Sequence, residues 1–249
     1  MSESTPGKGV MPPTLKVLAA IPCFNEAGFI ADVVKGVRKF VPEVAVIDDG
    51  STDGTAEAAQ LAGAKVIKHS TQKGAGAATK TAFLTAMERG VDILVTLDGD
   101  AQHDPDDLPA VLAPALEGRA DIVIGSRFLR PGYVVPAYRK FGIDVITWLF
   151  NIGSKVKVTD SQSGYRAYTR KAVESLVPTE SGFSFSVQTL IEARRLGLRI
   201  AEAPISCIYH EYGSTKNPVA HGLSVALAVA RLRLKGRTRK RAPARRQYQ

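Results

Sequence analysis

Residues 91–102, VDILVTLDGDAQ, decide the fold class of this chain. Residues 93–97 predict a short buried strand, and two aspartates separated by one glycine follow it at once. Side chains alternate along a strand, so we expect Asp98 and Asp100 to point the same way from its carboxyl end. Hard divalent cations prefer oxygen ligands, and Gln102 offers a third one. Because Asp and Gly are also turn formers, these residues alone leave a metal site and a plain turn both open.

The surrounding sequence alternates between strands and helices. Strands are predicted at 15–21, 44–47, 65–68, 93–97 and 121–125, and helices at 26–40, 55–61, from about 77 to 90 and at 105–116. Pro22 is expected to end the first strand, and Asn25 to cap the first helix. This alternation predicts an α/β fold with a mostly parallel central sheet flanked by helices. In such sheets ligands bind outside the carboxyl ends of the strands.

The pattern changes after Arg130. A helix is predicted at 138–156, a loop entering a strand at 160–169, a helix at 185–196 and a strand at 199–209. An amphipathic helix is then expected at 222–234. The helix at 138–156 carries an apolar stripe that we expect to pack in the core, although it could instead face a membrane. The stripe consists of Phe141, Val145, Trp148, Leu149 and Ile152.

Charge is concentrated at the carboxyl end of the chain. Residues 231–249 hold nine Lys or Arg and no Asp or Glu, which leaves 24 basic and 24 acidic residues elsewhere. The net charge of +9 therefore belongs to a tail that suits either an anionic membrane surface or a disordered solubilising segment. A neutral body argues against nucleic-acid binding. The sequence has neither a secretory signal nor an apolar run of about 18–20 residues, so we expect a peripheral protein in the cytoplasm.

Six motifs then occur in one order. They are PCFNE at 22–26, IDDGSTDGT at 47–55, KGAGAA at 73–78, LDGDAQHDP at 97–105, GSRF at 125–128 and SGYRAY at 163–168. Together they resemble the family 2 glycosyltransferases, and in particular the branch that makes polyprenyl-phosphate sugars, such as dolichol-phosphate mannose or glucose synthases. The resemblance covers about residues 15–217 and implies a GT-A fold there. We expect a flexible stretch at 1–14, and an amphipathic helix with a basic tail at 218–249.

The resemblance also implies a site. The residues implied to bind the donor are Pro22, Asn25, Glu26, Asp48, Asp49 and Lys73. Asp98, Asp100 and Gln102 match the motif that holds Mg²⁺ or Mn²⁺ with the sugar nucleotide. Ser126, Arg127 and Arg139 match positions that contact the acceptor phosphate, and Lys140 adds charge beside them. Asp100, Arg127 and Arg139 are the implied catalytic residues. His210 or Lys216 would contact the pyrophosphate where the family often has an arginine.

The implied reaction is an inverting, metal-dependent transfer of a hexose from a nucleoside-diphosphate sugar, such as GDP-mannose or UDP-glucose, to a polyprenyl or dolichyl phosphate. It would occur on the cytoplasmic face of the membrane, with a separate membrane subunit as a possible partner. Three alternatives stay open: a family 2 enzyme with another acceptor, a sugar-nucleotide pyrophosphorylase, and a nucleic-acid-binding protein. A pyrophosphorylase needs a Gly-rich loop after the first strand, and the chain has Pro-Cys-Phe-Asn-Glu there.

Overall fold

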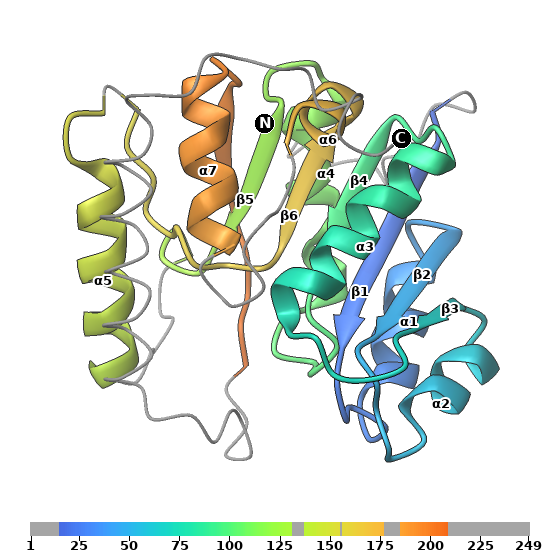
Figure 1. Ribbon diagram of the computed structural model, residues 1–249. Coiled ribbons are helices and arrows are strands. Elements are labelled where there is room, and N and C mark those ends of the chain that lie inside the picture. The colour runs from blue at the N-terminus through green and yellow to red at the C-terminus, as the bar shows by residue number, and fades with distance from the viewer. Residues whose placement is uncertain (1–14, 131–136, 155, 177–184, 209–249) are drawn as a thin grey trace, which may run out of the picture.

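A computed structural model describes residues 15–130, 137–154, 156–176 and 185–208 (Figure 1). Its sheet has the strand order β3-β2-β1-β4-β6-β5-β7. The strands are β1 (Val17–Cys23), β2 (Glu43–Asp48), β3 (Lys65–Lys68), β4 (Ile93–Thr96), β5 (Ile122–Ser126), β6 (Arg166–Thr169) and β7 (Ile200–Pro204). The helices are α1 (Ile30–Arg38), α2 (Thr55–Leu61), α3 (Ala75–Glu88), the 3-10 turn η1 (Pro105–Asp107), α4 (Leu108–Leu116), α5 (Ala137–Asn151), α6 (Arg170–Ser175) and α7 (Phe185–Arg195).

The sheet is mostly parallel, as predicted, with one exception. The strands β1 to β4 pair in parallel, and so do β5 and β7. Strand β6 lies between β4 and β5 and runs antiparallel to both. The start of β6 therefore lies at the same edge of the sheet as the carboxyl ends of β4 and β5.

Buried side chains fill both faces of the sheet. Alternation along β1 sends Ala19 and Ile21 to one face and Leu18 and Ala20 to the other, and all four are fully buried. The first face packs against α1, α2 and α4, and the second against α3, α6 and α7. With apolar layers on both sides, only the two edges at the strand ends are left for polar chemistry.

Two local predictions at the first strand are wrong. Strand β1 continues through Pro22 to Cys23, because Pro22 lies beyond the last residue that pairs with β4 and only β2 adjoins it. Asn25 does not cap α1, which begins at Ile30 after Phe29. Asn25 instead has a φ of 56° and accepts a hydrogen bond at Oδ1 from the Thr52 amide at 3.0 Å. It ties the loop after β1 to the loop after β2.

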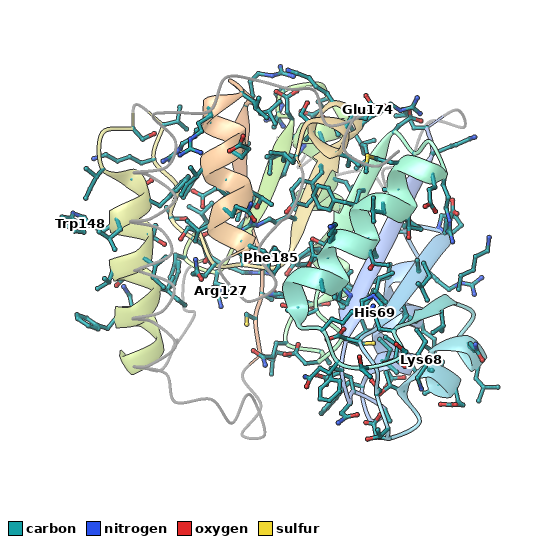
Figure 2. The ribbon with its side chains drawn as sticks, in the orientation of Figure 1. Lys68, His69, Arg127, Trp148, Glu174 and Phe185 are labelled. Carbon is teal, nitrogen blue, oxygen red and sulfur yellow. The ribbon has the colours of Figure 1, made fainter. Side chains whose placement is uncertain are left out.

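The apolar stripe of α5 is not a core stripe. Phe141 is 72% exposed, Trp148 65% and Ile152 45%, and Val156 beyond the helix is 59% exposed. Figure 2 shows Trp148 projecting away from the body of the protein. The buried face of α5 is instead formed by residues such as Ile146 and Phe150, which pack in the second core layer. Of the predicted stripe, Leu149 packs against this layer, whereas Phe141, Trp148 and Ile152 are exposed, because helical periodicity does not say how much of an apolar face is covered.

Several predictions lie outside the described residues. These are the stretch 1–14, the helix at 222–234, the basic tail, His210 and Lys216. In the part of the chain that the structure describes, no helix combines the length and apolar character needed to cross a bilayer.

Candidate active site

The acidic loop after β4 is a tight turn held against the core. The sequence predicted that strand alternation orients Asp98 and Asp100. This prediction is wrong, because strand β4 ends at Thr96 and both aspartates lie in the turn that follows it. A Cβ on Gly99 would lie 2.9 Å from the Cβ of Cys23, so only glycine fits there. Ala101 has a φ of 56°, in the left-handed region. The close packing of Gly99 fixes the two flanking carboxylates on one short loop.

Asp98 lies over the start of the antiparallel strand. A Cβ on Gly164 would come within 2.8 Å of Asp98 Oδ1, so this glycine makes room for the carboxylate. The side chain of Asp98 is 51% exposed, and His103 Nδ1 lies 3.6 Å from its Oδ2. Desolvation raises the pKa of Asp98, whereas the positive charges of Arg127 and Arg166 lower it. Asp98 is thus an accessible carboxylate in a basic surrounding.

Asp100 and Glu26 add negative charge beside Asp98. Asp100 accepts hydrogen bonds from Gln102, at 3.0 Å from its backbone amide and 2.7 Å from its side-chain Nε2. Desolvation and the charge of Asp98 raise the pKa of Asp100. Desolvation, together with Asp100 and Asp98, raises the pKa of Glu26 to about 7. The three carboxylates repel one another, and a cation would relieve this repulsion.

This donor set fits a hard divalent cation. Carboxylate oxygens are what Mg²⁺ and Mn²⁺ prefer, and the neighbouring carboxylates that help to raise the pKa values of Glu26 and Asp100 indicate an unbalanced negative charge. Among the described residues, no group of three or more His, Cys, Asp or Glu is arranged as a complete ligand set. The remaining ligands would then come from substrate phosphates and water, as is usual for Mg²⁺ sites. The amide nitrogen of Gln102, rather than its oxygen, faces Asp100 here.

The loop after β2, which is predicted to bind the donor, surrounds a buried carboxylate. Asp48 is fully buried, and its Oδ1 accepts a hydrogen bond from the Ser51 amide at 2.8 Å. Its Oδ2 lies 3.5 Å from Lys68 Nζ but has no hydrogen-bond partner. The backbone amides of Asn25 and Glu26 donate to Ser51 Oγ and Thr55 Oγ1. An unpaired buried oxygen at the end of β2 could accept from an N–H of a nucleobase.

Asp49 is occupied with the protein itself. Its carboxylate lies 2.7 Å from His69 Nδ1 and accepts hydrogen bonds from the backbone amides of Lys73 and Gly74. His69 is buried and completes the link through Thr81. Asp49 therefore anchors the loop that leads into α3 and leaves the Lys73 side chain exposed.

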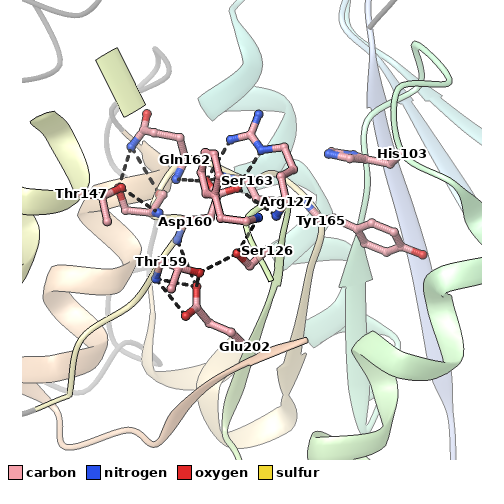
Figure 3. A network of polar contacts seen from close by, with 12 residues as sticks. His103, Ser126, Arg127, Thr147, Thr159, Asp160, Gln162, Ser163, Tyr165 and Glu202 are labelled. Carbon is pink, nitrogen blue, oxygen red and sulfur yellow. Dashed lines mark hydrogen bonds and ion pairs between the residues drawn. The ribbon is translucent and has the colours of Figure 1, made fainter. Parts of the chain in front are cut away.

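A separate polar network follows β5, around residues predicted to contact the acceptor (Figure 3). Arg127 makes a two-bond ion pair with Asp160, with Nε 2.7 Å from Oδ2 and Nη2 2.9 Å from Oδ1. Glu202 on β7 accepts from the backbone amides of Thr159 and Asp160. Thr159 also shares a 2.6 Å hydrogen bond with Ser126. Asp160 is fully buried, and its ion pair with Arg127 lowers the pKa of the Asp160 carboxyl. The two-bond pair holds the guanidinium of Arg127 in the plane of this carboxylate.

The other predicted acceptor residues lie on α5. Arg139 belongs to the first turn of this helix. Lys140 pairs with Asp144 at 2.6 Å and lies 5.5 Å from the centre of the Phe128 ring. The guanidinium carbon of Arg127 also lies 5.9 Å from the centre of the Phe128 ring. Cations from the β5 loop and from α5 thus meet around one aromatic ring.

Sequence reasoning missed four residues of this region: His103, Asp160, Arg166 and Glu202. Arg166 is buried at 1% exposure and donates only to neutral acceptors, namely the carbonyls of Ser161, Ser163 and Ser186 and the Thr189 hydroxyl. Asp160 and Arg166 lie in the stretch DSQSGYRAYT, where an aspartate and an arginine six residues apart were a usable signal. Nothing in the local sequence indicated Glu202, because β7 contributes it from a distant part of the chain.

The sheet is mostly parallel, carries a carboxylate loop after its central strand and contains one inserted antiparallel strand. This combination defines the GT-A class of nucleotide-sugar-dependent transferases. The family model of glycosyl transferase family 2 matches residues 19–177. The chain belongs to this family and is a glycosyltransferase.

Two curated relatives and one solved structure illustrate the similarity. The chain is 35% identical over 218 residues to an undecaprenyl-phosphate mannosyltransferase of Micrococcus luteus, covering 81% of this chain and 87% of that protein. It is 33% identical to a UDP-N-acetylglucosamine–dolichyl-phosphate N-acetylglucosaminyltransferase of Methanococcus voltae, covering 79% and 87%. The fold matches glucosyl-3-phosphoglycerate synthase of Mycobacterium tuberculosis, in complex with Mn²⁺, UDP and glucosyl-3-phosphoglycerate, with a TM-score of 0.70, 23% identity and coverage of 94% and 86%.

Proposed function

We propose that this protein transfers a hexose from a nucleoside-diphosphate sugar to a polyprenyl phosphate, with inversion at the anomeric carbon and with Mg²⁺ or Mn²⁺. One observation carries the proposal. The acidic loop with Asp98 and the basic loop with Arg127 follow β4 and β5, and the segment that enters β6 contacts both. A diphosphate donor and a phosphate acceptor would thus be held on two sides of one segment. The lipid acceptors named for the two curated relatives support the acceptor class.

The donor would bind along the loops after β1, β2 and β4. Asp98, Asp100 and Gln102 would hold the cation, which would neutralise charge on the departing diphosphate. Asp48 and the loop residues Asn25 and Glu26 would contact the nucleoside. Lys73, whose side chain is exposed, would approach the diphosphate or the sugar.

The acceptor phosphate would bind at the basic loop after β5. A phosphate monoester with a second pKa near 6 is mostly a dianion at neutral pH, so its oxygen can attack without losing a proton. No general base is therefore assigned. The task of the protein is to hold this dianion against the negative donor, which suits Arg127, Arg139 and Lys140. A single in-line displacement gives inversion.

A lipid acceptor also explains the exposed face of α5. Phe141, Trp148 and Ile152 form an uncovered apolar face on the helix that carries Arg139. We propose that this face and the basic tail bind the cytoplasmic surface of the membrane, with or without a separate membrane subunit, and that residues 15–217 form the catalytic domain. In vesicle sedimentation, a Phe141→Ser/Trp148→Ser variant should bind anionic vesicles about tenfold more weakly. A Leu61→Ser variant serves as the control, because Leu61 is 90% exposed on α2, and it should have no effect.

A donor panel tests the function directly. Radiolabelled GDP-mannose, UDP-glucose and UDP-N-acetylglucosamine are each incubated with a short polyprenyl phosphate and Mn²⁺, and the product is extracted into organic solvent. We expect one donor to give a labelled lipid, and EDTA or Asp100→Ala to abolish it. A parallel arm supplies 3-phosphoglycerate as acceptor. Transfer only to that water-soluble acceptor, or transfer that survives EDTA, would exclude the proposed reaction.

A further inference from the structure

His103 follows the acidic loop and its backbone is held on both sides. It forms an antiparallel bridge with Cys207, and the Ile208 amide donates to the Gln102 carbonyl at 2.8 Å. The side chain is only 4% exposed. His103 is therefore a rigid part of the wall behind the acidic loop.

The imidazole lies between an aromatic ring and a carboxylate. Its ring packs on Tyr165, with 5.3 Å between the ring centres. Its Nδ1 is covered by protein and has no hydrogen-bond partner, and Asp98 Oδ2 lies 3.6 Å away. In Figure 3 the imidazole of His103 lies beside Tyr165 and points toward Arg127. A buried polar atom without a hydrogen-bond partner lowers the stability of the fold by about 1–3 kcal/mol. An unpaired Nδ1 beside the acidic loop therefore needs an explanation.

We propose that His103 positions Asp98 for the divalent cation by donating a hydrogen bond from Nδ1–H to Oδ2 when the cation is bound. This inference rests on the metal dependence of the proposed function. Gly164 confines the carboxylate from one side and His103 faces it from another, so a shift of less than 1 Å converts the 3.6 Å contact into a hydrogen bond. The Nδ1 that faces Asp98 is covered, so this nitrogen does not bind the cation itself. Outer residues that orient metal-binding carboxylates typically change metal affinity 10–100-fold.

Two substitutions separate hydrogen bonding from packing. His103→Phe keeps a ring against Tyr165 but has no donor. His103→Asn places an amide N–H near the position of Nδ1 and restores the donor. Folding of both is checked by circular dichroism and by the urea midpoint.

The readout is Mn²⁺ affinity, measured from the free-Mn²⁺ electron paramagnetic resonance signal with UDP or GDP present. We expect His103→Phe to bind Mn²⁺ 10–100-fold more weakly and His103→Asn to stay within about threefold of wild type. In turnover, the Mn²⁺ concentration for half-maximal rate should rise for His103→Phe, while kcat at saturating Mn²⁺ recovers. Equal Mn²⁺ affinity of His103→Phe and wild type overturns the inference, and so does an equal loss in both variants.

The wild-type protein supplies a second measurement in case the variants do not fold. With ¹⁵N-labelled histidine, the Nδ1–H proton of His103 should move downfield and exchange more slowly when Mg²⁺ and nucleotide are added. An unchanged resonance overturns the inference. If wild type binds no Mn²⁺ with either nucleotide, the metal dependence of the proposed function fails, whereas normal binding with unaltered variants removes only the role of His103.

Discussion

Replacing Glu26 with Gln should make the metal-free protein more stable above neutral pH. Desolvation and repulsion from Asp100 and Asp98 raise the pKa of Glu26 from 4.5 to about 7. Between these two values the folded chain keeps a proton that the unfolded chain has released. Stability therefore falls as the pH rises through this window. A glutamine carries no charge and removes this loss.

The magnitude follows from the pKa difference. A rise from 4.5 to about 7 corresponds to roughly 3 kcal/mol at about 1.4 kcal/mol for each pH unit. The Glu26 side chain is only partly buried, and solvent screening reduces the expected gain to about 1–2 kcal/mol. The gain should be close to zero at pH 5, where Glu26 of the folded wild type is protonated.

Urea unfolding in EDTA at pH 5 and pH 8.5 measures the effect for wild type, Glu26→Gln and the control Glu88→Gln. Glu88 is exposed at the end of α3, and its replacement should give the same small change at both pH values. Mn²⁺ with nucleotide should reduce the advantage of Glu26→Gln, because the cation offsets the same repulsion. An equal effect of Glu26→Gln at pH 5 and pH 8.5, or a loss of stability at pH 8.5, would refute the electrostatic reasoning.

Three further changes give distinct outcomes. Gly99→Ala should lower the free energy of unfolding by about 1–3 kcal/mol, because the new methyl group would lie 2.9 Å from the Cys23 Cβ; thermal and urea unfolding check this. Asp160→Asn should raise the KM for the lipid phosphate at least about tenfold, with a small change in the donor KM, because Arg127 loses its ion pair; equal changes in both constants would contradict a role on the acceptor side. Asp49→Asn should cost about 2–3 kcal/mol of stability and speed proteolysis of the loop after β3, because its carboxylate accepts two backbone amides there; limited proteolysis measures this.

Local signals predicted much of the first half of the fold. The helix Thr55–Leu61 and the strand Lys65–Lys68 have the predicted bounds, because apolar spacing and glycines mark both ends. The acidic loop was found because its carboxylates follow a strand of continuous apolar residues. The family resemblance of six ordered motifs is confirmed by the family match over residues 19–177.

Predictions that required knowledge of distant contacts were less successful. The four residues of β6 do not indicate that this strand runs antiparallel between β4 and β5, because strand direction depends on the path of the preceding chain. The partner of Arg127 lies 33 residues away in Asp160. The short helix α6 was missed because its six residues give no helical period. The roles of the individual site residues stay predictions that the substitutions above will test.

The antiparallel insertion of β6 has a mechanical consequence. Residues 160–164 contact both loops: Gly164 lies against the Asp98 carboxylate, and Asp160 pairs with the Arg127 guanidinium. The distance between these two groups is thus set by covalent chain length instead of by two independently mobile loops. In the proposed reaction, lengthening this connector by one residue would lower the rate of transfer while leaving each substrate its own binding loop. The sequence of α5 could change to suit another lipid without altering that spacing.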